Sequence, residues 1–295
     1  MNAEPVDLLS LVLTLRVVSQ PAPDAVLPRW WGRAAHALLL NIFRQVNPEL
    51  AKDLHKADNQ RPFTVSTLIG RFPKGALDRD EMYTLRLTCM RKDVCAVLLE
   101  AASSSLLSPG STLELDYLPF QVVAIEPHGL WSQDVLVDQE SNPALKTSPW
   151  AAAGTYQEIS AALLLAKEQA PRKVSLQFTS PTVFKSGGKH VPLPLPGLVF
   201  GSLLERWNQF APVTFPAEAK RYAEECLAVA RYRLSSRVIH IKSRGMRVGA
   251  VGGITYTSLN YDRYWMSVIA VLAAFALYAG VGAGTSMGMG QCRQN

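Results

Sequence analysis

Blocks of apolar and polar residues along the first half of the chain predict alternating strands and helices. Leu8–Val18 is a mostly apolar run of the length of a buried strand, and the three prolines between residues 21 and 28 mark an extended loop after it. The elements predicted next are a helix at Gly32–Val46, strands at Phe63–Ile69 and Met82–Met90, a helix at Asp93–Ser104 and a strand at Thr112–Glu126. This order, β-α-β-β-α-β, is that of a ferredoxin-like unit.

The second half of the chain repeats the same plan. Its predicted elements are a helix at Tyr156–Glu168, a strand at Lys173–Thr179, a helix at Gly197–Phe210, strands at Arg237–Lys242 and Ile254–Ser258, a helix at Asp262–Ala279 and a short final strand. The 295 residues are enough for two domains of ordinary size. We therefore expect an α+β protein with two tandem ferredoxin-like domains, residues 1–127 and 154–295, joined by a linker at residues 128–153.

The predicted helix at Gly32–Val46 is amphipathic. At roughly 100° per residue, its apolar positions gather on one face, and Arg33, Asn41 and Arg44 lie on the other. His36 lies at the edge of the polar face, one turn from Arg33. Because an imidazole titrates near neutrality, His36 is a candidate for proton transfer, and the alternative is a surface histidine with no role.

The end of the chain is rich in glycine, with five glycines in the eleven positions from Gly280 to Gly290. Glycine allows positive φ angles and lets a ligand approach main-chain N–H groups, so we expect an exposed backbone surface that suits phosphates or a nucleic-acid backbone. Too few residues follow to form the helix of a dinucleotide fingerprint, and the Gly-Lys-Ser/Thr ending of a nucleotide-binding P-loop is missing.

Positive charge is concentrated in one segment of a globular composition. Hydrophobic residues make up 48% of the chain and charged residues 18%, which excludes a disordered chain. The net charge is +6. The segment between Glu225 and Asp262 holds no acidic residue and six basic ones, which are Arg231, Arg233, Arg237, Lys242, Arg244 and Arg247. This segment accounts for the whole net charge and favours an anionic partner over a passive solvated hairpin.

The remaining features indicate a cytoplasmic protein without metal or cofactor. Glu4 and Asp7 precede the first apolar run, which is the wrong sign for a secretory signal. The uncharged run from Trp265 to Ala279 is shorter than the roughly twenty residues a bilayer needs, so no membrane is expected. The carboxylates form no compact pair, and no zinc-like spacing relates the cysteines (Cys89, Cys95, Cys226, Cys292) or the other histidines (His55, His128, His190, His240).

Several sequence blocks together resemble one family. They are Leu27-Pro-Arg-Trp, Gly32-Arg-Ala-Ala-His-Ala-Leu-Leu-Leu40, Arg61-Pro-Phe-Thr-Val-Ser66, Phe178-Thr-Ser-Pro-Thr-Val-Phe184, Leu198-Val-Phe-Gly-Ser-Leu-Leu-Glu-Arg-Trp-Asn208 and the closing Gly280-Val-Gly-Ala-Gly-Thr-Ser-Met-Gly-Met-Gly-Gln291. In these blocks, along nearly the whole chain, the sequence resembles the CRISPR repeat-cleaving endoribonucleases, the Cas6 family of the RAMP superfamily. Members of that family often carry Lys or Arg at the position of Gly284, where this chain departs from the pattern.

The resemblance implies metal-independent cleavage of CRISPR precursor RNA within each repeat. In this reaction the 2′-OH upstream of the scissile bond attacks the phosphorus and leaves a 2′,3′-cyclic phosphate and a 5′-OH. His36 would transfer a proton, Arg33 would stabilise the phosphorane, and Arg29 and Lys52 are weaker candidates for Arg33's part. A tyrosine base assists some members, but the first eighty residues contain no tyrosine. The groups expected to hold RNA are Arg29, Lys242, Arg244, Arg247, Gly280, Gly282, Gly284, Thr285, Ser286, Gly288 and Gly290.

Two alternatives stay open within the same superfamily. The chain could be a non-catalytic subunit that binds repeat RNA in a CRISPR effector complex, although a histidine on a basic helix argues against this. It could also be the processing module of a fusion with reverse transcriptase and integrase domains. A homodimer is open as well, because dimers occur in the family.

Overall fold

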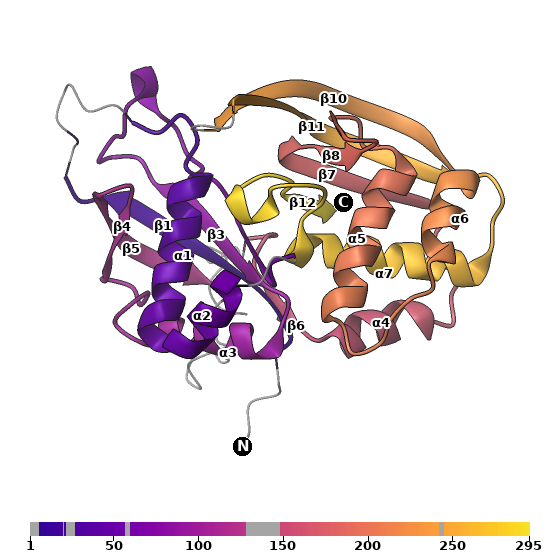
Figure 1. The fold of residues 1–295 in the computed structure, drawn as a ribbon, viewed down its shortest axis with the longest axis horizontal. Helices are drawn as coiled ribbons and strands as arrows, with labels where there is room; N and C mark the ends of the chain where they lie inside the picture. Colours follow the sequence, from indigo (N-terminus) through magenta and orange to yellow (C-terminus); the bar gives the residue numbers. More distant parts are fainter. Residues whose placement is uncertain (1–5, 20, 22–26, 57–59, 128–147, 242–244) are drawn as a thin grey trace, which may run out of the picture. The chain divides into compact units, whose positions relative to one another are not determined.

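The chain forms two units. The computed structural model describes residues 6–19, 21, 27–56, 60–127, 148–241 and 245–295. The N-terminal unit is Met1–Ala153 and the C-terminal unit is Gly154–Asn295, and Figure 1 colours them from indigo to magenta and from pink to yellow. Most of the predicted linker, residues 128–147, lies outside the described residues.

The N-terminal unit is a helix-covered antiparallel sheet. Its elements are β1 (Leu8–Val17), α1 (Gly32–Val46), α2 (Pro48–Lys56), β2 (Phe63–Val65), the 3₁₀ turn η1 (Pro73–Gly75), β3 (Tyr83–Cys89), α3 (Lys92–Ser103), β4 (Thr112–Leu115), β5 (Leu118–Glu126) and β6 (Ala152–Gly154). The strand order is β2-β3-β1-β5-β4, with β6 also paired to β1. The first four strands of this order have ferredoxin-like topology, and β4 extends the edge.

Two predicted strands of this unit have different bounds. The prediction of one strand at Thr112–Glu126 is wrong, because Asp116 and Tyr117 adopt positive φ angles of 51° and 67° and turn the chain into the β4–β5 hairpin. The predicted strand at Phe63–Ile69 ends at Val65, and Ile69 makes only an isolated bridge to Thr84. Helix α2 was not predicted.

The two faces of the N-terminal sheet differ in chemistry. Alternate residues of β1 (Leu9, Leu11, Leu13, Leu15 and Val17) join the core with residues of α1 and α3. The opposite face is polar but buried. There the Thr64 and Thr88 hydroxyls lie 2.6 Å apart, and the Arg86 guanidinium lies 4.7 Å from the ring centre of Trp150. Ser10 donates a hydrogen bond to the Trp150 carbonyl, so residues near Trp150 pack on this face.

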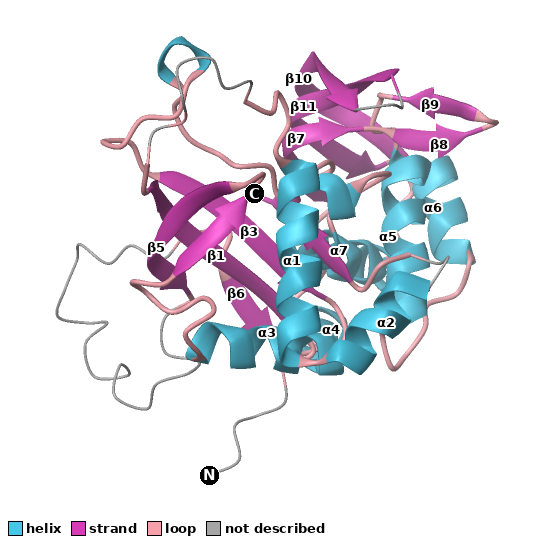
Figure 2. Ribbon diagram, turned by 60° about the vertical axis from the view of Figure 1, so that its left-hand side comes forward, coloured by secondary structure: helices cyan, strands magenta, loops and turns pink. Residues whose placement is uncertain are grey.

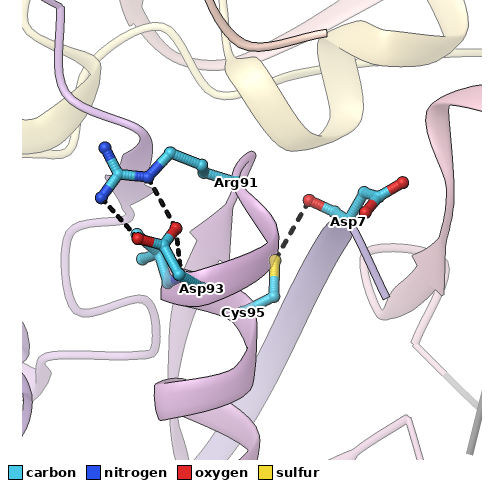
Figure 3. A network of polar contacts seen from close by, with 5 residues as sticks. Asp7, Arg91, Asp93 and Cys95 are labelled. Atoms are coloured by element: carbon cyan, nitrogen blue, oxygen red, sulfur yellow. Dashed lines mark hydrogen bonds and ion pairs between the residues drawn. The ribbon is translucent and has the colours of Figure 1, made fainter. Parts of the chain in front are cut away.

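Polar contacts fix the start of α3 (Figure 3). Arg91 donates from Nε and Nη2 to the two carboxylate oxygens of Asp93, at 2.6 and 2.8 Å, and Val94 N–H donates to the same carboxylate. Burial by itself raises the pKa of Asp93, but its bonds to Arg91 and Val94 outweigh burial and lower the pKa. The Cys95 thiol donates to the Asp7 carbonyl, so the helix start is attached to the strand that begins at Leu8.

The C-terminal unit has the same topology, and Figure 2 shows its sheet with helices beside it. Its elements are α4 (Tyr156–Leu164), β7 (Lys173–Thr182), β8 (Phe184–Ser186), β9 (Lys189–Val191), α5 (Pro196–Phe210), α6 (Glu218–Cys226), β10 (Leu227–Ile241), β11 (Gly245–Ser258), α7 (Arg263–Ala279), the 3₁₀ turn η2 (Thr285–Met287) and β12 (Cys292–Gln294). The strand order β10-β11-β7-β12 is again ferredoxin-like. The prediction of two tandem ferredoxin-like domains is confirmed.

The central hairpin is much longer than predicted. The predicted strand at Arg237–Lys242 covers only the last residues of β10, which ends at Ile241, and the one at Ile254–Ser258 covers only the last residues of β11. The two strands pair from Leu227 with Ser258 to Ile241 with Gly245. Most of β10 is exposed, and a strand without a buried face lacks the apolar alternation that predicts it. The helix predicted to reach Glu168 ends at Leu164, because the next residue, Leu165, is 79% exposed and has no core to cover. Helix α6 and the β8–β9 hairpin were not predicted.

Helix α7 begins and ends as its sequence indicates. The Asp262 carboxylate accepts a hydrogen bond from Trp265 N–H, and Gly280 follows the last residue with φ of 61°. Most of the helix from Met266 onward is buried, whereas Arg263 and Tyr264 in its first turn are exposed. Among the described residues, no helix is long and apolar enough to cross a membrane.

Candidate nucleic-acid interface

His36 lies on α1, where an aromatic ring supports it. Its imidazole is partly exposed, and the ring centre lies 5.6 Å from that of buried Phe63 on β2. Buried Trp31 precedes the helix. Its backbone N–H donates to Thr67 Oγ1 at 3.1 Å, and its ring packs edge-on against Phe120. The first turns of α1, which carry His36, are therefore held by packing and by a side-chain hydrogen bond.

The other N-terminal candidates are more exposed than His36. Arg33 is on the first turn of α1, and Arg29 is in the loop before it, both exposed. Lys52, on α2, is paired with Glu49 at 2.7 Å. Arg33 and His36 thus share one helix, and a cation beside an imidazole one turn away can stabilise the charge of a phosphorane. Lys52 is already engaged with a carboxylate.

Four arginines of the hairpin share one face of the C-terminal sheet. Side chains two or four residues apart on a strand point to the same side, so exposed Arg231, Arg233 and Arg237 share one side of β10. Ile239 is the next position on that side, and it pairs with Arg247 of β11, which therefore lies on the same side. We call Arg231, Arg233, Arg237 and Arg247 the arginine face. Lys242 and Arg244, two of the predicted RNA-binding residues, lie outside the described residues.

The arginine face lies on the side of the sheet away from the helices. Arg231 pairs with Thr255, and Thr255 pairs with Ser175 of β7, with their hydroxyls 2.8 Å apart. The next positions, Ile254 and Tyr256, point to the opposite side and are buried in the core. Apart from buried Ile239, the hairpin side chains on this side of the sheet are therefore mainly polar and basic. The described part of the hairpin carries no acidic side chain, so this surface suits a phosphate backbone.

The glycine-rich loop, Gly280–Gly290, needs its glycines for its own fold. All five glycines have positive φ angles, from 61° to 87°. A Cβ atom on Gly282 would lie 2.4 Å from the Val183 carbonyl oxygen, and one on Gly290 would lie 2.1 Å from the Val281 oxygen. These distances leave no space for a side chain, so backbone packs directly on backbone.

The prediction of an exposed backbone surface in this loop is wrong. Gly280, Thr285, Gly288 and Gly290 are buried, and the other loop residues are partly exposed or buried except Met287. Many of the loop's N–H groups bind within the C-terminal unit, as those of Val281, Gly282, Ala283, Met287, Met289 and Gly290 do. Two of these bonds attach the loop to the end of β7. Gly290 N–H donates to the carbonyl of Pro181, and Ala283 N–H donates to that of Val183, the residue after the strand. Any contact with RNA is left to the part of the loop around η2.

Arg206 on α5 is a loop contact that was not predicted. Its Nη1 donates to the carbonyls of Ala279 and Gly280, both at 2.8 Å, and its Nη2 donates to the Gly282 carbonyl at 2.5 Å. One turn earlier, Ser202 Oγ accepts a hydrogen bond from Gly282 N–H at 3.1 Å. Burial lowers the pKa of Arg206 to about 10, which leaves it charged at neutral pH. Its signal in the sequence is a cation within the apolar stripe of a helix.

The remaining candidates for chemistry do not gather at one place. Cys89, Cys95 and Cys292 are buried, as cysteines in apolar contexts often are. His190 and His240 are exposed on β9 and β10. Among the residues that the structure describes, no group of three or more His, Cys, Asp or Glu side chains could hold a metal ion.

Two features define the class of this protein: tandem ferredoxin-like units, and a glycine-rich loop between the last helix and the last strand. The sequence matches the family described as CRISPR Cas6 N-terminal domain over residues 9–161 and CRISPR-associated endoribonuclease Cas6 over residues 176–292. The chain belongs to the Cas6 family.

Individual relatives agree with this family. A CRISPR-associated endoribonuclease Cas6 of Mycobacterium tuberculosis (strain CDC 1551 / Oshkosh) is 32% identical over 124 residues, which are 41% of this chain and 38% of that protein. The chain thus matches well under half of that relative's length. A Cas6 solved as a product complex is 25% identical, with a TM-score of 0.72 over 98% of this chain and 99% of that one. A Thermus thermophilus Cas6 has a TM-score of 0.66 at the same identity and coverage.

Replacement of Gly290 by alanine should disrupt the loop. The new Cβ would overlap the Val281 carbonyl oxygen and force a positive φ on an L-residue, so we expect a loss of unfolding free energy above about 2 kcal/mol. Gly187→Ala is the matched control, because Gly187 also has a positive φ, of 55°, but a Cβ added there would meet no atom within 4 Å. This control should cost only about 1 kcal/mol. Denaturant titration measures both. Equal losses would show that close approach does not constrain the loop.

Proposed function

We propose that this protein is a metal-independent endoribonuclease that cleaves CRISPR precursor RNA within its repeats and produces guide RNAs. The observation that carries the proposal is membership in the Cas6 family across both units, residues 9–161 and 176–292. The relatives' names support it, since curated matches are Cas6 endoribonucleases and one similar structure is a product complex. The partner is therefore the repeat RNA.

The proposed chemistry takes its nucleophile from the substrate. The 2′-OH next to the scissile phosphate attacks the phosphorus, the bond to the 5′-oxygen breaks, and the products end in a 2′,3′-cyclic phosphate and a 5′-OH. No water or metal-bound hydroxide takes part in this step. The protein aligns the attacking 2′-oxygen with the leaving 5′-oxygen and stabilises the negative charge that develops on the phosphorane. It also removes the proton of the 2′-OH and supplies a proton to the 5′-oxygen.

His36 is the proposed proton-transfer residue, acting as general acid toward the 5′-oxygen or as general base toward the 2′-OH. Two observations support it: its ring is partly open to solvent, and Phe63 holds the ring from one side. An imidazole that titrates near neutrality can give or take a proton at physiological pH. One similar solved structure is that of a Cas6 variant in which a histidine is replaced by alanine.

RNA binding is assigned to the arginine face, the cations near α1 and the residues around η2. Arg33 and Arg29 are exposed at the start of α1, and Thr285 and Ser286 lie in η2. The arginine face supplies separate guanidinium groups, three of them exposed and that of Arg247 partly exposed, and each is able to contact one phosphate. Because these contacts are exposed, they should be screened by salt, whereas the proton transfer at His36 should not be.

His36→Ala should lower the single-turnover rate of repeat RNA cleavage by about 10²-fold or more, the usual effect of losing a general acid or base. Binding should stay within a few-fold of wild type. His190→Ala is the control, since His190 is an exposed histidine on β9, and should leave the rate unchanged. A His36→Ala rate within threefold of wild type would remove His36 from the mechanism.

A substrate with 2′-H in place of the one 2′-OH next to the scissile phosphate should bind but not be cleaved. EDTA in excess should leave cleavage of the normal RNA unchanged. The product ends, analysed by mass spectrometry, should be a 2′,3′-cyclic phosphate and a 5′-OH. Rapid cleavage of the deoxy substrate, or ends of 3′-OH and 5′-phosphate, would identify water as the nucleophile. Binding without any cleavage of normal RNA would favour a non-catalytic subunit.

The double variant Arg231→Ala/Arg233→Ala should weaken RNA binding and flatten its dependence on salt. Each lost phosphate contact should reduce the slope of log K against log salt by about 0.7 for single-stranded RNA. The matched control is Lys220→Ala/Arg221→Ala on α6, which removes the same charge where each cation faces a glutamate. Titrations at several salt concentrations measure both. Equal slopes for the two variants would show that the arginine face does not contact the RNA backbone.

A further inference from the structure

We propose that Arg206 is a positioning residue, whose buried guanidinium holds the first residues of the glycine-rich loop in the shape with which the loop contacts RNA. This inference rests on the proposed function, because it presumes that the loop binds RNA. Arg206 itself is only 7% exposed. It therefore acts through the backbone of Ala279, Gly280 and Gly282, to which it donates three hydrogen bonds.

The geometry of these three bonds requires a forked donor. The acceptors belong to the last residue of α7, the glycine that ends the helix, and the second glycine of the loop, so one side chain fixes the path by which the chain leaves the helix. A guanidinium is planar and presents its N–H groups in fixed directions. A lysine offers a single nitrogen, and an apolar side chain would leave buried carbonyl oxygens without a donor.

Gly282 is held from three directions, which shows that its position is tightly specified. Its carbonyl accepts from Arg206 and its N–H donates to Ser202, both on α5 and one turn apart. On the remaining side the Val183 carbonyl lies too close for any Cβ. Because the next residue, Ala283, also donates to the Val183 carbonyl, the chain enters η2 from a fixed starting point.

The charge of Arg206 also agrees with this role. Burying a cation is unfavourable, as its lowered pKa reflects. The C-terminal end of α7 offsets part of that cost, since its carbonyls carry the negative end of the helix dipole. Glycine and backbone hydrogen bonds alone can cap a helix end, and the bond from Gly280 N–H to the Ala276 carbonyl already does so here. The arginine adds a connection from α5 to the loop.

The test compares Arg206→Met and Arg206→Lys with a core variant of the same helix, Phe200→Leu, in the full-length protein. Phe200 is buried in the core and its ring packs edge-on against Tyr256, so this variant reports the effect of lost stability. The RNA is the repeat encoded next to the gene, with 2′-H at the cleavage position so that binding is measured without cleavage. Hydrogen exchange of the N–H groups of Val281, Gly282 and Ala283 provides a local readout.

We expect Arg206→Met to weaken RNA binding at least tenfold and to speed exchange of these loop N–H groups. Arg206→Lys should recover part of the affinity, and Phe200→Leu should bind within twofold of wild type at a comparable loss of thermal stability. The inference is overturned if Arg206→Met binds within twofold of wild type, or if Phe200→Leu weakens binding equally. If the wild-type protein does not bind the repeat RNA, it is the proposed function that fails, and this inference falls with it.

Discussion

The close packing of backbone on backbone around the glycine-rich loop is the constraint on which the C-terminal unit depends. The loop joins α7, the most buried helix, to β12, which completes the sheet beside β7. Gly290 N–H donates to the Pro181 carbonyl and Ala283 N–H to the Val183 carbonyl, so the loop lies directly on the end of β7. A side chain at Gly282 or Gly290 would push these segments apart. The position of the last helix, the last strand and η2 therefore follows from one set of contacts that only glycine permits.

The cations of this unit act in two different ways. Arg206 is buried and bonded to backbone carbonyls, so its effect is geometric and little screened by salt. The arginines of β10 are exposed, and single exposed charges contribute little to stability. Their alternation on one side of the sheet instead makes a row of positive charge away from the core. A binding assay at varied salt separates the two, because only the exposed row should release counterions on binding.

How far the sequence predicts this structure depends on where each segment buries its side chains. The bounds of β1, α1 and α7 were predicted within one residue, since each buries an apolar stripe or is apolar throughout. Strand β10 was largely missed because most of its side chains are exposed, and Ser235 and Ser236 interrupt the alternation of its arginines with apolar residues. The turn at Asp116–Tyr117 was missed because positive φ at two non-glycine residues has no strong signal. The glycines of the loop were recognised, but sequence cannot distinguish glycine that admits a ligand from glycine that admits another backbone.

The proposed function assigns a different task to each of the two units. In the proposed mechanism, proton transfer is assigned to α1 of the N-terminal unit, where Phe63 supports His36 and Trp31 holds the helix start. Contact with the RNA backbone is assigned, in the same proposal, to the arginine face and the loop of the C-terminal unit. Proton transfer depends on placing one imidazole within hydrogen-bond reach of one oxygen, so a change there should alter the rate constant at saturating RNA. Phosphate contacts stabilise the bound substrate and the transition state to similar extents. Losing them should therefore raise the RNA concentration needed for half-maximal rate and leave the rate constant at saturating RNA nearly unchanged. A variant of the arginine face that lowered the saturated rate instead would mean that these cations also align the RNA for attack.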